Sequence, residues 1–267
     1  MRLAILSQRG GVGKTTVAIS LLEFWKAPLY ELELGFPKLW PAEPEFRETV
    51  TWRLSRFDRQ QCDLCEECVK NCQFGALVRE GEVIKHRGFR CRGCGLCKEV
   101  CPRKAISLKE IKLGEIAKGE WEKVPVYAAR FLRGGTLEGV LWSHLYEKFP
   151  LGENAILKAP LGLNGENLQA VKEAESLLLL TTPSRAVEEI SLFAEIVQGI
   201  GLPGAVLLNF STEKTKDLRV KAESKGLWWA GEIPPLDDLS HGLLKAYPSV
   251  QDIFVRLLEP EKGGYNA

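Results

Sequence analysis

The sequence lacks an excess of charge of either sign. Its 36 Lys and Arg residues balance 35 Asp and Glu residues, so the formal net charge is +1. Such a chain has no general electrostatic attraction for nucleic acid or for an anionic membrane surface. We therefore expect no nucleic-acid partner, because any charge-driven contact would need a local patch.

Long apolar segments are also missing. The apolar start of the chain, residues 1–6, is too short for a signal peptide. No later apolar run approaches the roughly 18 residues that a membrane-spanning helix needs. These absences predict a cytoplasmic protein without stable membrane insertion.

Cysteine is absent outside one short segment. All eight cysteines fall between Cys62 and Cys101. A disulfide framework is typical of small secreted chains, not of one stretch within a large chain without a leader. Metal ligation is therefore the better interpretation.

These cysteines form two copies of the pattern C-x-x-C-x-x-C-x-x-x-C, which start 29 positions apart at Cys62 and Cys91. In this spacing three cysteines bind one [4Fe-4S] cluster and the fourth reaches the other cluster. We therefore assign Cys62, Cys65, Cys68 and Cys101 to cluster 1, and Cys91, Cys94, Cys97 and Cys72 to cluster 2. The segment resembles the bacterial two-cluster ferredoxins. A pair of zinc knuckles is the alternative, although zinc sites do not usually share ligands in this way.

The charges around the two copies differ. Acidic residues accompany the first copy, at Asp63, Glu66 and Glu67, and basic residues accompany the second, at Arg90, Arg92, Lys98, Arg103 and Lys104. Positive charge stabilises the reduced, more negative form of a cluster. This predicts the higher reduction potential for cluster 2; the alternative is a solvated charged surface with little influence on either cluster.

Outside the cysteine segment, apolar runs alternate with helical patterns. Strands are expected at residues 2–7, 28–34, 124–132, 154–157, 176–181, 205–209 and 227–230, and helices at residues 14–26, 136–149, 185–199 and 249–258. This alternation predicts an α/β fold with a mostly parallel sheet and helices on both faces. We place the nucleotide-binding core at residues 1–50 and 110–267, with an inserted α+β ferredoxin domain at residues 51–109.

A glycine-rich turn joins the first strand to the first helix. It reads Arg9, Gly10, Gly11, Val12, Gly13, Lys14, Thr15 and Thr16. Glycines allow the backbone N–H groups to turn around phosphate oxygens, and the helix N-terminus favours an anion. Lys14 is expected at the β and γ phosphates, and the Thr15 hydroxyl at Mg²⁺. A Gly-rich turn without a ligand is the alternative, which the Gly-Lys-Thr sequence at this position disfavours.

The loop resembles the deviant Walker A motif of the MinD/ParA family, which usually reads Lys-Gly-Gly-x-Gly-Lys-Thr. Glu31 and Glu33 lie where that family has an Asp-x-Asp pair, and Asn209 closes a strand as the family's adenine-contacting Asn does. The resemblance implies an ATP- or ADP-binding P-loop protein that uses Mg²⁺ and forms dimers. Among its members are ATPases with a ferredoxin inserted after the second strand.

Two positions depart from the family pattern. Arg9 stands where the family has the Lys that reaches across a dimer, and Lys158 stands where the switch segment has an Asp that helps to hold Mg²⁺. A cation at residue 158 is expected to repel Mg²⁺ and to pair with a phosphate instead. The candidate catalytic residues are Lys14, Arg9 and Glu33, with Glu33 as a water-positioning group. Nucleotide binding is expected to persist, and hydrolysis is left open.

The leading hypothesis is that the nucleotide state controls electron transfer or iron–sulfur cluster delivery by the ferredoxin module. One alternative is a hydrolysis-deficient subunit that lends Arg9 to an active relative; another is a cluster scaffold. The expected partners are a second copy or a related ATPase, together with a redox protein or an apo-iron–sulfur protein.

Overall fold

The computed structural model describes residues 1–267 except 36–37, 88–89, 133–136, 213–214, 237–241 and 259–267. Its main sheet has the strand order β11-β10-β9-β1-β8-β2-β7-β6-β3. The strands on the P-loop side are β1 (Arg2–Ser7), β2 (Leu29–Glu31), β7 (Val124–Phe131), β8 (Ala155–Leu161), β9 (Ser176–Thr181), β10 (Gly204–Asn209) and β11 (Trp228–Ile233). Every pairing from β11 to β7 is parallel. The predicted α/β fold class is confirmed.

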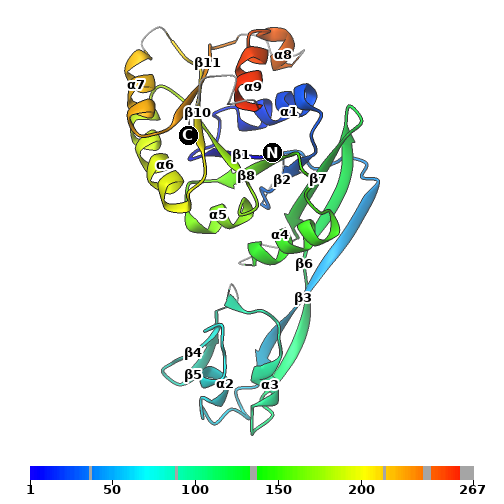
Figure 1. Ribbon diagram of the computed structural model, residues 1–267. Coiled ribbons are helices and arrows are strands. Elements are labelled where there is room, and N and C mark those ends of the chain that lie inside the picture. Colours follow the sequence, from blue (N-terminus) through cyan, green and yellow to red (C-terminus); the bar gives the residue numbers. More distant parts are fainter. Residues whose placement is uncertain (36–37, 88–89, 133–136, 213–214, 237–241, 259–267) are drawn as a thin grey trace.

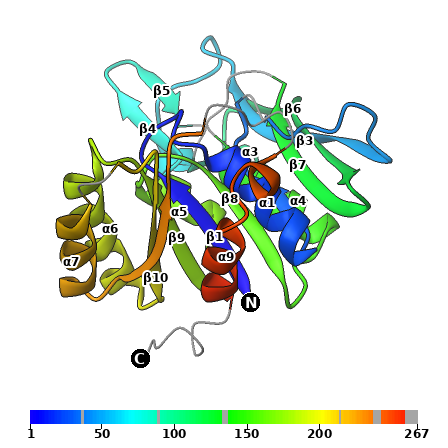
Figure 2. The same cartoon turned by 90° about the horizontal axis from the view of Figure 1, so that it is seen from above.

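Helices cover both faces of this sheet because the buried strands alternate their side chains between two cores. In β1, Leu3 and Ile5 face one core while Ala4 and Leu6 face the other. The first core is closed by α1 (Lys14–Trp25), α8 (Leu243–Ala246) and α9 (Val250–Leu258), and Figure 2 looks onto this side. The second is closed by α4 (Glu138–Lys148), α5 (Gly165–Ala170), α6 (Ala186–Ile200) and α7 (Lys216–Ser224).

Several elements differ from the sequence-based expectation. The strand expected at residues 28–34 is shorter, because β2 ends at Glu31. The helix expected at residues 136–149 begins at Glu138, and residue 136 lies outside the described residues. Helix α7 was not expected, since Leu218 and Ala222 are its buried residues and its mean composition is polar. No helix in the described part of the chain has both the length and the apolar character to cross a bilayer.

The sheet continues into a long antiparallel ribbon that carries the cysteine module. Strands β3 (Phe46–Phe57) and β6 (Ile106–Trp121) pair from Phe46 and Lys118 at one end to Phe57 and Ile106 at the other. Figure 1 shows the ribbon extending away from the body with the module at its far end. A bulge between Val50 and Thr51 interrupts the register, and bulges bend the strand that contains them. The predicted boundaries at residues 51 and 109 fall within this ribbon and stay a prediction.

The module itself has little apolar core. It contains the short helices α2 (Glu67–Lys70) and α3 (Leu96–Glu99) and the hairpin β4 (Leu77–Glu80) and β5 (Val83–His86). Its buried cluster consists of Cys68, Leu77 and Ile106. Such a small buried cluster supplies little hydrophobic stabilisation, and units of this kind usually need a further source such as disulfides or bound metal.

Gly114 fixes the base of the ribbon against the body. A Cβ at this position would collide with the Arg130 backbone oxygen and lie 2.8 Å from Leu141 of α4. We predict that Gly114→Ala destabilises the folded chain by about 2 kcal/mol, because overpacking forces backbone shifts. Chemical denaturation followed by circular dichroism measures this change.

Gly139→Ala is the matched control. A Cβ at residue 139 would have its nearest neighbour at 3.7 Å, and alanine is favoured over glycine within a helix by roughly 0.5–1 kcal/mol. The control should therefore be neutral or stabilising. Equal losses in the two variants would contradict the close packing at Gly114.

Candidate functional site

The glycine-rich turn forms a loop between β1 and α1. Gly11 and Gly13 have φ values of 81° and 89°, in the left-handed region that favours glycine. A Cβ on Gly13 would also collide with the amide nitrogen of Asn209. The loop lines a cavity of about 300 Å³ with these other residues: Glu33, Lys38, Lys158, Leu161 and Phe210.

All predicted loop residues, Arg9, Gly10, Gly11, Val12, Gly13, Lys14, Thr15 and Thr16, line this cavity. Asn209 supports the loop instead of lining the cavity. Its side-chain amide donates to the Val12 backbone oxygen at 2.9 Å, and it is buried. The expected contact between Asn209 and adenine stays a prediction. Phe210 and Lys38 were not predicted, since only the fold brings their segments beside the loop.

Lys14 is held by strand β8. Its Nζ donates to the Ala159 oxygen at 2.6 Å and to the Pro160 oxygen at 3.1 Å. Burial, and then the nearby Lys158 charge, lower the pKa of Lys14 to about 8. The ammonium group therefore lies at the loop with neutral carbonyl partners that phosphate oxygens can replace.

Lys158 does not extend toward the loop as a free cation. Its Nζ lies 2.8 Å from each Glu31 carboxylate oxygen and 3.3 Å from Glu33 Oε2. Lys158 is 1% exposed and Glu31 is fully buried. Two carboxylates already pair with Lys158, so its expected pairing with a phosphate stays a prediction. Glu33, the expected water-positioning group, is tied to the same ammonium.

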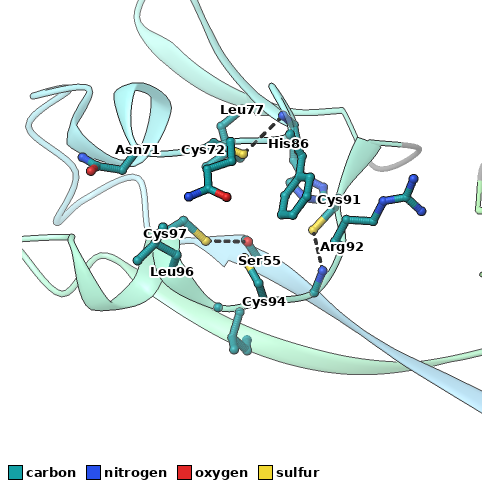
Figure 3. A pocket seen from close by; sticks show the side chains of 16 residues that line it. Ser55, Asn71, Cys72, Leu77, His86, Cys91, Arg92, Cys94, Leu96 and Cys97 are labelled. Atoms are coloured by element: carbon teal, nitrogen blue, oxygen red, sulfur yellow. Dashed lines mark hydrogen bonds between the residues drawn. The ribbon is translucent and has the colours of Figure 1, made fainter.

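Four cysteines from both copies of the repeat surround a second cavity, of about 180 Å³. Figure 3 shows Cys72 from the first copy beside Cys91, Cys94 and Cys97 from the second. These are the four residues assigned to cluster 2, although the ligand assignment itself stays a prediction. Figure 3 also shows Ser55 next to the Cys97 sulfur.

The cysteines assigned to cluster 1 do not line this cavity. Burial, and then the proximity of Cys101 and Cys62, raise the pKa of Cys68 to about 11. Cys65 is exposed, and its backbone N–H donates to Asp63 Oδ1 at 3.3 Å. Cys101 of the second copy is therefore near Cys68 and Cys62 of the first.

The two copies share an unusual backbone. Leu64 and Glu66 have positive φ values of 59° and 63°, and Gly93 and Gly95 at the equivalent positions have 66° and 81°. A residue other than glycine in the left-handed conformation is strained by about 1 kcal/mol or more. The left-handed conformation therefore recurs at equivalent positions of the two copies.

The thiols fit the donor set of an iron–sulfur cluster. A [4Fe-4S] cluster takes four cysteine sulfurs around a cage of irons, and four such sulfurs line the 180 Å³ cavity. Within the described ranges, no three His, Cys, Asp or Glu side chains converge on a point where one ion could bind.

One charge is placed differently from the sequence-based grouping. Arg103, counted with the second copy, lies against the first copy with its Nε 2.7 Å from Asp63 Oδ2. The physical reason is the crossing of Cys101 toward Cys68, which carries the residues after it to the same side. Arg103 therefore lies with the cysteines assigned to cluster 1 and is removed from the charges expected to favour reduction of cluster 2.

Comparison with known proteins separates the two parts of the chain. Residues 60–106 match the family described as 4Fe-4S dicluster domain. The pyruvate synthase subunit PorD of Thermotoga maritima is 33% identical over 93 residues, which is 33% of this chain and 88% of the relative. The indolepyruvate oxidoreductase subunit IorA of Methanothermobacter thermautotrophicus is 46% identical over 58 residues, which is 21% of this chain and 9% of the relative.

Solved structures resemble the chain over its whole length. The MinD cell division protein of Aquifex aeolicus has a TM-score of 0.50 at 14% identity, covering 100% of this chain and 98% of that chain. A chain of the MinC:MinD cell division protein complex of the same organism has a TM-score of 0.53 at 12% identity, covering 100% of this chain and 97% of that chain. At this identity the likeness concerns the fold.

The crossing of ligands between the repeats gives a prediction. Cys72→Ser and Cys97→Ser should each disturb cluster 2, because both thiols line the same cavity, whereas Cys68→Ser should disturb cluster 1. Iron analysis should find about four fewer irons, or one altered cluster, in each variant. The electron paramagnetic resonance spectra of the remaining cluster should match for the first two variants and differ for the third. Matching spectra for Cys72→Ser and Cys68→Ser would mean that each copy binds its own cluster.

The buried ion pair gives a second prediction. Lys158→Met leaves Glu31 buried without its cation, so we expect a loss of about 3–5 kcal/mol in the free energy of unfolding. The double variant with Glu31→Gln should regain most of that loss. Denaturant titration measures both.

An exposed pair provides the control. Arg219 Nε and Glu223 Oε1 are 2.8 Å apart on the surface of α7, and exposed pairs contribute about 0–1 kcal/mol. Arg219→Ala should therefore change stability by less than about 1 kcal/mol. A similarly small effect of Lys158→Met would contradict the structural role of the buried pair.

Proposed function

We propose that this chain binds ATP and couples its nucleotide state to the iron–sulfur module. The premise is that it belongs to the 4Fe-4S dicluster ferredoxins through its inserted segment and has the MinD/ParA fold in the remainder. The single observation that carries the proposal is the presence of both sites in one chain. A loop with a buried Lys14 follows the central strand β1, and a four-cysteine cavity lies at the end of the ribbon that leaves the same sheet. The coupled process is electron transfer or cluster delivery.

The loop residues would hold the phosphates of ATP or ADP. The backbone N–H groups of Gly10, Gly11, Val12 and Gly13 would contact phosphate oxygens. Thr16, in the first turn of α1, lines the same cavity and would also bind the nucleotide. Lys14 would leave the Ala159 and Pro160 carbonyls for the β and γ phosphates, and Thr15 would contact Mg²⁺. Phe210 lines the cavity with 41% exposure, so its ring is available to the base.

A route between the sites runs through the sheet. The carbonyls that hold Lys14 belong to β8, which pairs with β2, and β2 pairs with β7. Strand β7 pairs with β6, which forms the ribbon with β3. Release of Lys14 toward a phosphate would change the contacts of β8 and thereby bias the position of the ribbon. Coupling between two sites requires two global states of the protein whose equilibrium is shifted by both sites.

The alternative of a hydrolysis-deficient subunit has a specific observation in its favour. Glu33 is ion-paired with Lys158, and a carboxylate that accepts from an ammonium is a weaker partner for an attacking water. Such a subunit would keep nucleotide binding, extend the exposed Arg9 toward a related ATPase and contribute its clusters. A homodimer is the corresponding proposal for an active chain. In either case the external partner is a redox protein or an apo-iron–sulfur protein.

The test uses the full chain prepared without oxygen. It should contain about eight irons, as two four-iron clusters require. Reduction of the clusters and their transfer to an apo-ferredoxin are measured without nucleotide, with ADP and with ATP, while phosphate release is followed. We expect ATP to change one of the two rates, and Lys14→Ala to abolish the change. Rates independent of nucleotide would reject the coupling.

Phosphate release and metal content decide among the other possibilities. Normal turnover by the chain alone would exclude the hydrolysis-deficient subunit. Clusters that transfer irrespective of nucleotide would favour the scaffold. A colourless preparation that contains zinc would reject the redox account altogether.

Nucleotide binding should depend on pH through Lys14. The pKa of Lys14 is lowered to about 8 by burial and by Lys158, so its ammonium is present below pH 8 and is lost as the pH rises above it. Since phosphate binding needs the charged form, affinity for ATP should fall about tenfold between pH 7 and pH 9. Calorimetric titration at each pH measures the affinity. Lys14→Arg, which stays charged, should bind without this fall, and a constant wild-type affinity would contradict the assigned role.

A further inference from the structure

Ser55 contacts a predicted cluster ligand from outside the cysteine repeats. It lies on β3, before the matched residues 60–106. Its Oγ is 3.0 Å from the Cys97 sulfur, and the contact is partly buried (Figure 3). We propose that Ser55 sets the reduction potential of cluster 2 by donating a hydrogen bond to the Cys97 sulfur. The proposal rests on the cluster content proposed above.

The direction of this hydrogen bond follows from the chemistry of the ligand. A cysteine that binds iron is a thiolate and carries no proton. The Ser55 hydroxyl must therefore donate, and the sulfur must accept. Reduction by one electron adds negative charge to the cluster and its sulfurs. A hydrogen bond to sulfur stabilises that charge, so it favours the reduced form and raises the potential.

Hydrogen bonds to sulfur are concentrated on one side of the module. The Cys72 sulfur accepts from Ala76 N at 3.3 Å, and the Cys91 sulfur accepts from Gly93 N at 3.4 Å. With Ser55, three of the four thiols around the cavity have a donor within the described residues. Among the cysteines assigned to cluster 1, Cys65 instead has the Asp63 carboxylate beside it. This distribution favours the higher potential for cluster 2 even though Arg103 lies with cluster 1.

Ser55 differs from the two backbone donors in its origin. Ala76 and Gly93 belong to the module that wraps the thiols, whereas Ser55 pairs with Leu108 across the ribbon. Its hydroxyl position is therefore set by the ribbon. It is also a side chain, which makes it removable by substitution while the cysteine loops keep their backbone.

The experiment is a redox titration of the cluster-loaded full chain, followed by electron paramagnetic resonance. Ser55→Ala removes the hydroxyl, and Ser55→Thr retains it. We expect Ser55→Ala to shift the equilibrium between the oxidised and reduced forms of one cluster about tenfold toward the oxidised form, which is a fall of about 59 mV for a one-electron couple. The other cluster should keep its potential, and Ser55→Thr should remain close to wild type.

Ser107→Ala is the matched control. Ser107 is an exposed hydroxyl on the opposite strand of the same ribbon, paired with Arg56, and its removal should change neither potential. Should Ser55→Ala lose iron, the reduction potentials of Ser55→Thr and Ser55→Val are compared instead to test the role of the hydroxyl. Threonine and valine have nearly the same shape and differ in the hydroxyl.

The outcomes separate this inference from the proposed function. Full iron and sulfide content with no shift in Ser55→Ala would overturn the role of Ser55 and leave the two-cluster content intact. Equal shifts of both clusters, or the same shift in the Thr and Ala variants, would also overturn it. Absence of clusters from the wild-type chain would instead reject the proposed function.

Discussion

The arrangement around the phosphate loop depends on one buried ion pair. Lys158 on β8 and Glu31 at the end of β2 are almost completely removed from solvent and bond through both carboxylate oxygens. A lone charge in either place would be costly by several kcal/mol, so neither residue is tolerated without the other. The pair joins adjacent strands where the cavity opens and leaves Lys14 as the buried cation that a phosphate can reach. The Glu31 carboxylate therefore compensates the charge that Lys158 places at this position.

The sequence predicted the parts of the molecule that depend on local spacing. The P-loop and the two cysteine copies are short motifs whose chemistry fixes their conformation, and β9 was predicted with its observed bounds because its run of buried leucines is continuous. Strand β3 was not predicted. Its exposed and partly buried residues alternate with few fully buried ones, so it lacks the apolar signal of a core strand.

Contacts between segments far apart in the chain could not be predicted from the sequence. Nothing in the sequence near Lys158 indicates that Glu31, 127 residues away, neutralises it. Arg103 was grouped by sequence distance, whereas the crossing of Cys101 decides its location. Ser55 is separated from Cys97 by 42 positions and carries no motif. In each case the residue type was visible, but its partner was determined by how the fold brings distant segments together.

The ribbon holds the cysteine module at a defined distance from the parallel part of the sheet. A single-chain linker would let the clusters sample many positions, whereas two strands hydrogen-bonded along their length resist both bending and torsion. Each residue added to both strands would carry the clusters about 3.3 Å farther from the sheet and rotate them with the strand twist. The number of residues in β3 and β6 therefore sets the distance between the cysteine module and the parallel part of the sheet that carries the glycine-rich loop.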